Sequence, residues 1–182
     1  NQITNTELIL DLLKKKNFVP NFVIDVGCGY GQWTKKLLKF YPSSQYLLFD
    51  ADKNNTKKLS DLKKNHNNLN FKICLLSDDN SSYKFFNMGY GSSIFEEQTS
   101  YKREVEEIVS TTLYQELPIE LKKKSNNLIK LDVQGAELKV LDGLKEVYRL
   151  VPKNGTLLQP IIIKAEEKSK KLVRVKSKVS IK

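Results

Sequence analysis

The sequence has 182 residues, of which 40% are hydrophobic and 29% are charged, and its formal net charge at pH 7 is +10. This length and composition fit one globular domain and are not those of a disordered or disulfide-stapled chain. No apolar run approaches the roughly 18 residues of a membrane-spanning helix, and the N-terminus shows no signal pattern. Cys28 and Cys74 form neither a disulfide framework nor a zinc spacing, which favours reduced thiols in a cytoplasmic protein.

The predicted elements alternate between strands and helices. A first helix ends near Lys16 and is followed by a strand over 22–26, a helix over 32–40, a strand over 46–49, a helix over 54–64 and a strand over 71–76. Residues 77–101 are predicted to form a long loop, and residues 105–113 have mixed strand character. A short helix over 117–124, a strand over 128–133 and a helix over 137–150 follow. This order predicts an α/β fold with a mostly parallel sheet and helices on both faces.

The C-terminal part differs in composition from the rest. Residues 164–182 carry eight basic and two acidic side chains, which suits a solvated tail or a contact with nucleic acid or an anionic surface. Residues 157–163 are apolar but contain Pro160, which suits an edge strand, and residues 173–181 alternate between apolar and basic side chains. We therefore divide the chain into a main domain over 1–150 and a basic segment over 151–182, with a sheet that is incomplete at its C-terminal end.

A glycine-rich segment, D-V-G-C-G-Y-G, occupies residues 25–31 directly after the first predicted strand. Such glycines let the backbone approach a ligand, and the following helix offers free N–H groups. The dinucleotide fingerprint would place a glycine at Gln32, which disfavours a nicotinamide dehydrogenase. Asp25, two residues before the first glycine, suits a ligand with an ammonium group, such as S-adenosylmethionine (SAM). Gly27, Cys28 and Gly29 are the accompanying predicted contacts, and a ligand-free glycine turn is the alternative.

The next two strand ends supply further candidates for cofactor binding. Asp50 ends the second strand at a distance from Gly27 that is typical of a carboxylate that binds ribose hydroxyls, and Ala51 follows it. The alternative role for Asp50 is a helix N-cap. At the third strand end, Ser77 and Asp78 could reach an adenine ring or form a plain turn.

The fourth strand end reads K-L-D-V-Q-G-A-E over residues 130–137. Asp132 ends an apolar strand and is expected to face the same site. Glu137 begins a helix, where its charge also suits the helix dipole. Lys130 lies in a buried strand and needs a partner, for which Asp132 and Glu137 are the candidates. Two carboxylates are too few to predict a metal site.

Together, these four segments resemble the FkbM-type methyltransferase family, and the fourth is the most specific of them. The stretch Gly91-Ser92-Ser93 is also similar to a feature of the family, and the resemblance extends over about residues 23–144. It implies a Rossmann-like class I methyltransferase fold that uses SAM for O-methylation of sugars, glycans or natural products. It also implies SAM contacts at Asp25, Gly27, Gly29 and Asp50 and around Ser77, with Asp132 near the transferred methyl group.

The predicted function is therefore SAM-dependent methylation of a hydroxyl on a sugar, glycan or related small molecule. His66 lies in a polar stretch that suits a solvated loop, so a carboxylate is the better candidate for the general base. We assign this role to Asp132, supported by Glu137 and Lys130. The long loop over 77–101 is the candidate acceptor-binding lid, although its aromatic side chains could equally pack on the core. The alternatives are a ribose methyltransferase that acts on nucleic acid, or an inactive basic nucleic-acid-binding module.

Overall fold

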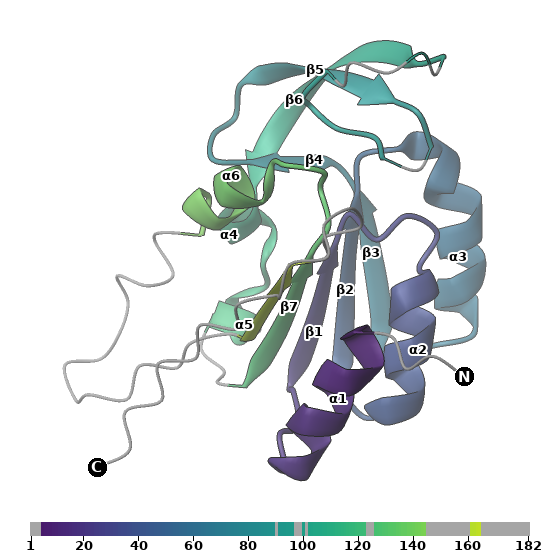
Figure 1. Ribbon diagram of the computed structural model, residues 1–182, viewed down its shortest axis with the longest axis vertical. Helices are drawn as coiled ribbons and strands as arrows, with labels where there is room; N and C mark the ends of the chain where they lie inside the picture. Colours follow the sequence, from purple (N-terminus) through teal and green to yellow (C-terminus); the bar gives the residue numbers. More distant parts are fainter. Residues whose placement is uncertain are drawn as a thin grey trace, which may run out of the picture.

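The computed structural model describes residues 5–89, 91–96, 100, 102–122, 126–144 and 161–164 (Figure 1). Its helices and strands in chain order are α1 (Asn5–Lys15), β1 (Phe22–Val26), α2 (Gln32–Phe40), β2 (Gln45–Asp50), the 3₁₀ helix η1 (Lys53–Asn55), α3 (Thr56–Lys64), β3 (Leu69–Ile73), β4 (Leu75–Ser77), β5 (Ser82–Asn87), β6 (Glu104–Thr112), α4 (Leu113–Glu116), α5 (Ile119–Lys122), β7 (Asn127–Leu131), α6 (Glu137–Asp142) and β8 (Ile161–Lys164).

The main sheet is parallel and has the strand order β3-β2-β1-β7-β8. The chain moves outward from β1 to β2 and β3, and later returns to β7 on the other side of β1. The strand order therefore reverses between the neighbouring strands β1 and β7. Open α/β sheets bind ligands at the carboxyl ends of the strands at such a point. These strands and the helices around them confirm the predicted α/β fold with a mostly parallel sheet.

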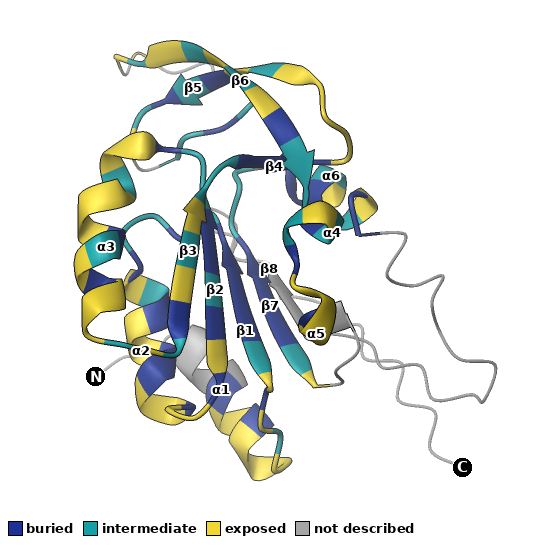
Figure 2. Cartoon of the chain, turned by 180° about the vertical axis from the view of Figure 1, so that it is seen from behind, coloured by how far each residue is buried: buried dark blue, intermediate teal, exposed yellow. Residues whose placement is uncertain are grey.

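Helices cover the main sheet on both faces, as its apolar strands predict. One core cluster joins α1, α2 and α3 to the side chains of Val23, Leu48 and Leu128. The second cluster joins α4, α6 and the segment around α5 to Ile24 and Phe49 on the opposite face. Figure 2 shows the buried strands between these two layers. Successive strand residues alternate between the two clusters because side chains in a β-strand point to alternate faces.

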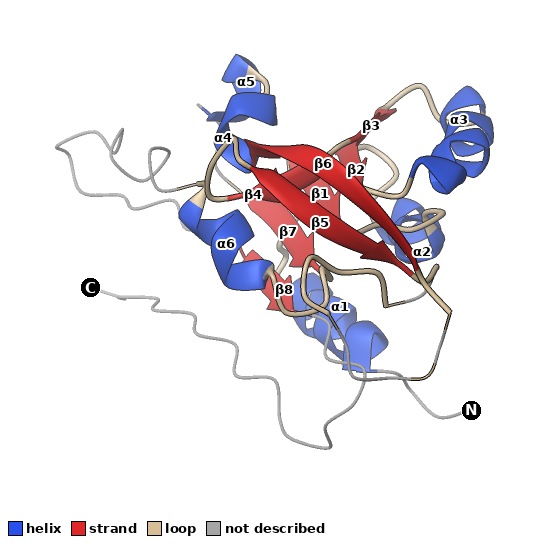
Figure 3. Ribbon diagram, turned by 90° about the horizontal axis from the view of Figure 1, so that it is seen from above, coloured by secondary structure: helices blue, strands red, loops and turns tan. Residues whose placement is uncertain are grey.

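A second sheet with the order β4-β6-β5 lies beside the upper end of the main sheet (Figures 1 and 3). The prediction of one long loop over 77–101 is wrong in part, because residues 82–87 form β5 and pair antiparallel with β6. The predicted strand over 71–76 is likewise divided at Cys74 into β3 and β4, which belong to different sheets. Strand β5 was not predicted because one of its faces is polar, and such a strand resembles a loop in composition.

The C-terminal expectations are covered only in part by the structure. Strand β8 pairs in parallel with β7 and lies at the edge of the main sheet among the described strands. Helix α6 begins at Glu137, as predicted, and residues 145–150 of the predicted helix lie outside the described residues. Residues 157–160 and 173–181, which were predicted to belong to edge strands, also lie outside them. Within the described part of the chain, every helix is too short or too polar to span a bilayer.

Candidate functional site

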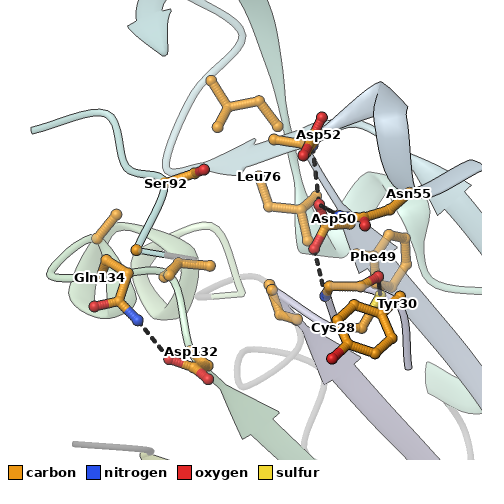
Figure 4. Close-up of a pocket in the computed structure, with 18 of the residues that line it drawn as sticks. Cys28, Tyr30, Phe49, Asp50, Asp52, Asn55, Leu76, Ser92, Asp132 and Gln134 are labelled. Carbon is orange, nitrogen blue, oxygen red and sulfur yellow. Dashed lines mark hydrogen bonds between the residues drawn. The ribbon is translucent and has the colours of Figure 1, made fainter. Parts of the chain in front are cut away.

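A cavity of about 320 Å³ opens at the point where the strand order reverses. Its wall is built from the ends of β1, β2, β4 and β7, from the start of α2 and from the loop that follows β5. Figure 4 shows the side chains of Asp50 and Asp132 on opposite sides of this cavity. A cavity of this size is in the range that binds small molecules and cofactors.

The glycine-rich loop forms one wall of the cavity, and two of its glycines have distinct roles. Gly27 has φ +68°, and a Cβ atom built on it would lie 1.9 Å from the carbonyl oxygen of Asp132. Gly29 has φ +54°, and a Cβ atom there would meet nothing within 4 Å. Gly27 therefore allows β1 and β7 to approach closely, whereas Gly29 leaves bare backbone facing open space.

The Asp50 carboxylate at the end of β2 is held by several donors. Its Oδ2 accepts a hydrogen bond from the Gly29 backbone N–H at 2.6 Å, and its Oδ1 accepts from the Asp52 N–H at 2.9 Å and from Asn55 Nδ2 at 3.2 Å. Burial raises the pKa of Asp50, and these hydrogen bonds oppose the increase. Asp52, not Asp50, caps η1, because its side chain accepts from the Asn54 N–H.

Three charged side chains link β1 to β7 below the cavity. The Lys130 ammonium lies 3.1 Å from Asp25 Oδ1 and 3.3 Å from Asp132 Oδ2, and it donates to the Gly27 carbonyl at 3.0 Å. Asp25 is fully buried and also accepts from Thr34 Oγ1 at 2.7 Å. Burial lowers the pKa of Lys130, but the two carboxylates raise it by more, so the net shift is upward. The lysine therefore stays charged and pairs with both acids.

Asp132 is the most exposed member of this group, and it lines the cavity together with Lys130. Its side chain is 30% exposed, compared with 5% for Lys130 and 0% for Asp25. Its Oδ1 accepts a hydrogen bond from Gln134 Nε2 at 3.0 Å (Figure 4). A partly exposed carboxylate between an ammonium and an amide can accept a proton from a bound molecule.

The loop after β5 supplies the wall nearest to Gln134. Gly89, Gly91, Ser92 and Ile94 line the cavity, together with Phe85 of β5. Ser93 does not line it but anchors the loop, because its Oγ donates to the Gln134 carbonyl at 2.9 Å.

A comparison with protein-family models matches residues 17–171 to the Methyltransferase FkbM domain. The chain belongs to the FkbM methyltransferase domain family. This match confirms the predicted family and makes SAM the cofactor that membership implies. A search of curated protein sequences gave no match.

Two solved methyltransferase structures are similar to the FkbM domain at low identity. Coclaurine N-methyltransferase bound to N-methylheliamine and SAH is 13% identical, with a TM-score of 0.33, over 71% of this chain and 29% of that chain. Precorrin-6y C5,15-methyltransferase from Geobacter metallireducens GS-15 is 10% identical, with a TM-score of 0.39, over 90% of this chain and 64% of that chain. The FkbM domain therefore spans less than two thirds of either protein.

Seven of the residues predicted for the site line the cavity of the FkbM domain. They are Gly27, Cys28, Gly29, Asp50, Ala51, Lys130 and Asp132. Sequence reasoning missed other parts of the wall, among them Trp33, Phe49, Asn55 and Gln134. The segment around Gln134 was singled out, but nothing in the sequence shows that its amide faces Asp132.

Two residues predicted as cofactor contacts at the third strand end, Ser77 and Asp78, lie outside the cavity lining. Ser77 is fully buried, and a Cβ atom on Gly143 would lie 2.3 Å from its carbonyl oxygen, so α6 covers it. Asp78 forms an ion pair with Lys139 at 3.0 Å, outside the cavity lining. The cavity is lined by the residues just before Ser77, which are Cys74, Leu75 and Leu76. Ser77, the last residue of β4, is already outside the cavity wall.

Asp25 and Glu137 also lie outside the cavity lining, so the predicted roles of both residues stay predictions. Asp25 is paired with Lys130 and Thr34, as described above. Glu137 is 5% exposed, and its Oε1 accepts from the backbone N–H groups of Val133 and Gly135 at 3.4 and 3.2 Å. Its carboxylate therefore stabilises the turn before α6, and Lys130 pairs with Asp25 and Asp132 rather than with Glu137.

The cavity of the FkbM domain fits SAM in the chemistry of its lining. The bare backbone at Gly29 leaves room for a ligand against the glycine loop. Asp50 and Asn55 are polar groups of the kind that bind ribose hydroxyls, and Phe49 and Leu76 are apolar surfaces that suit a flat ring. Among the described residues, no group of three or more His, Cys, Asp or Glu side chains is arranged to hold a metal ion.

Proposed function

We propose that this domain transfers a methyl group from SAM to a hydroxyl group of a sugar, glycan or related small molecule. The observation that carries the proposal is the Asp132 carboxylate, which reaches the cavity opposite Asp50 (Figure 4). The position of Asp132 suits proton removal from an acceptor, and the glycine loop suits binding of the donor.

For the cofactor, we propose contacts from Gly27, Cys28, Gly29, Asp50 and Ala51, all of which line the cavity. When bound, SAM supplies a methyl group on a positively charged sulfur that an oxygen nucleophile can attack. Asp50 would accept hydrogen bonds from ribose hydroxyls, and Asn55 would keep its carboxylate oriented through the 3.2 Å contact. Asp25 would act indirectly, because it holds Lys130 beneath the loop.

For proton transfer, we propose Asp132 as the general base. A hydroxyl group becomes a better nucleophile as its proton moves to a carboxylate within hydrogen-bonding distance. Lys130 keeps Asp132 oriented through their 3.3 Å contact, so it is a positioning residue. Glu137 supports the same turn from behind through its two backbone hydrogen bonds.

For the acceptor, we propose the part of the cavity between Trp33 and the loop at Gly91 and Ser92. An indole ring beside hydroxyl, amide and carboxylate groups suits a sugar, because sugars have an apolar face and many hydroxyl groups. The supporting observation is that these groups line the same cavity as Asp132. Aromatic side chains of the β5 region have other roles: Phe85 is 5% exposed and contributes to the wall, and Tyr83 bonds to Asp78 and Asp79.

A second candidate function is methylation of a ribose hydroxyl in nucleic acid. Helices α2 and α3 together carry seven lysines and one acid, Asp61, and Lys36 lines the cavity. These basic helices would attract a phosphate backbone, with an affinity that falls steeply as salt increases.

The first experiment is a calorimetric titration of the chain with SAM, with NAD as the control ligand. We expect SAM to bind, NAD not to bind, and Asp50→Ala to lose SAM binding. Formation of S-adenosylhomocysteine is then measured with methyl glycosides, free monosaccharides and an RNA oligonucleotide as acceptors. Asp132→Asn should bind SAM normally and lose turnover. Full turnover in that variant would refute the base assignment, and turnover with RNA alone would favour the second candidate.

A further inference from the structure

We infer that Gln134 is a positioning residue that couples the acceptor wall of the cavity to the carboxylate of Asp132. The inference rests on the proposed function, because it gives Gln134 a role in the same methyl transfer. It concerns a residue that lines the cavity, contacts Asp132 through its side chain and contacts Ser93 through its backbone carbonyl, so it can be tested separately from cofactor binding.

The backbone of Gln134 has an uncommon conformation. Its φ is +50°, in the left-handed region that few residues other than glycine adopt, and it precedes Gly135 with φ +99°. A residue persists in this region when its surroundings hold it there, and such residues cluster at functional sites. Here, the side chain of Gln134 is hydrogen-bonded to Asp132 and its carbonyl group to Ser93. These two hydrogen bonds hold the residue in the left-handed conformation.

The side chain of Gln134 fixes one oxygen of Asp132. Its Nε2 donates to Asp132 Oδ1 at 3.0 Å, while Lys130 Nζ lies 3.3 Å from Asp132 Oδ2 (Figure 4). An ionised carboxylate can only accept, so the amide nitrogen rather than the amide oxygen must face it. A planar carboxylate with a partner at each oxygen has little freedom to rotate, and Asp132 is therefore kept in one orientation toward the cavity.

The backbone of Gln134 fixes the acceptor wall. Its carbonyl accepts from Ser93 Oγ at 2.9 Å, and Ser93 is 4% exposed. Ser93 also exchanges two backbone hydrogen bonds with Phe86 of β5, at 2.8 and 3.2 Å. Its neighbours Ser92 and Ile94 line the cavity. The wall is thus attached through Ser93 to the same residue that orients Asp132.

This arrangement has a consequence for catalysis. An acceptor that rests against Ser92 and Ile94 lies at a distance from Asp132 that Gln134 determines. Loss of the amide should therefore lower kcat, because misplacement of a base relative to its substrate slows the chemical step. It should leave SAM affinity unchanged, because Asp50, the proposed ribose contact, lies across the cavity from Gln134.

The linkage can be tested without any acceptor. In an ¹⁵N NMR spectrum of the full chain, the side-chain amide signal of Gln134 is identified from its absence in Gln134→Met. We expect this signal to shift in Asp132→Asn and in Ser93→Ala, and to stay in place in Lys64→Met, a change on the exposed end of α3. A Gln134 signal that is identical in wild type and in Asp132→Asn would overturn the inference.

The kinetic role is tested with the methyl glycoside that gives the most S-adenosylhomocysteine with the wild-type chain. Gln134→Met should lower kcat by about tenfold to a hundredfold, as expected for loss of a hydrogen bond to a charged group. The matched control is Gln45→Met, the same chemical change at an exposed position where β2 begins, and it should retain wild-type kcat.

Coupling between the two residues separates positioning from a general structural effect. If Gln134 acts through Asp132, Gln134→Met should lower kcat in the wild-type background and have little further effect on the residual kcat of Asp132→Asn, measured at high enzyme concentration. Equal losses in both backgrounds, or loss of SAM binding in Gln134→Met, would overturn the inference. Failure of the proposed function is distinct from either result, because it would appear as a wild-type chain that does not bind SAM or methylates no glycoside.

Discussion

The Asp50 carboxylate accepts a hydrogen bond from the Gly29 N–H across 2.6 Å, and this contact joins the glycine loop after β1 to the end of β2. The two residues are 21 positions apart in the sequence. The carboxylate thus holds the loop in shape and also lines the cavity. We expect one substitution at Asp50 to affect both the order of the loop and the binding of the cofactor.

The first prediction concerns the loss of this carboxylate. Asp50→Ala should weaken SAM binding by about a hundredfold or more, because it removes charge-assisted hydrogen bonds at a buried site. Calorimetry measures the effect. Asp61→Ala, which removes an exposed carboxylate on α3, is the control and should bind SAM as the wild type does. Unchanged affinity in Asp50→Ala would contradict the proposed ribose contact.

The pH dependence of SAM binding follows from the same residue. Burial raises the pKa of Asp50, so its carboxylate becomes protonated at a higher pH than an ordinary aspartate. A protonated Asp50 has less capacity to accept hydrogen bonds, so SAM affinity should fall as pH decreases through this raised pKa and recover above it. Titrations across the acidic range test the sign. Affinity that rises on acidification would contradict it.

Two glycines of the same loop should respond differently to alanine. Gly27→Ala places a Cβ atom 1.9 Å from a backbone oxygen that cannot move aside, so we expect a loss of more than about 4 kcal/mol in the free energy of unfolding, or no folded protein. In Gly29→Ala the new Cβ atom meets open space. The expected loss in the free energy of unfolding is therefore only about 1–2 kcal/mol, the cost of a left-handed conformation for a residue other than glycine. Thermal unfolding compares the two, and equal losses would contradict this assignment.

The buried pair of Asp25 and Lys130 gives a prediction about stability. Lys130→Met leaves the fully buried Asp25 carboxylate without its cation and should cost about 3–5 kcal/mol in the free energy of unfolding. The double variant Asp25→Asn/Lys130→Met removes both charges and should recover much of that loss. Turnover should not recover, because Asp132 still lacks its ammonium partner. Recovery of turnover together with stability would limit Lys130 to a structural role.

The two cysteines should react slowly with alkylating reagents. Burial raises the pKa of the Cys74 thiol to about 12 and raises the pKa of the Cys28 thiol well above its usual value. Only the thiolate reacts quickly, so both thiols should be modified far more slowly than free cysteine at neutral pH. Both line the cavity, and SAM should slow them further. Mass spectrometry follows the reaction, and rapid labelling of either thiol would contradict the prediction.

The pattern of apolar runs predicted the order of elements because local periodicity carries that information. It failed for β5, whose partner β6 lies beyond the intervening loop and whose outer face is polar. Pairing between distant strands leaves little trace in local composition, so residues 77–101 resembled a loop. The same limit explains why one predicted strand over 71–76 is divided between two sheets.

For the site, the sequence determined which segments meet. The residues after β1, β2 and β7 were predicted to share one cavity because the carboxyl ends of parallel strands lie at the same edge of a sheet. The glycine spacing and the segment over 130–137 also determined the family.

Only the tertiary structure decided which side chains face the cavity and which face one another. Asp25 lies directly opposite Lys130 in the register of β1 and β7 and pairs with it. The sequence had suggested only Asp132 and Glu137 as partners of Lys130. Asp132 emerges into the cavity while Asp25 stays beneath it, and Gln134 turns back on Asp132 because its backbone is left-handed. The register of β1 and β7 and the burial of Asp25 and Lys130 arise from contacts between segments about a hundred residues apart, and no local pattern contains them.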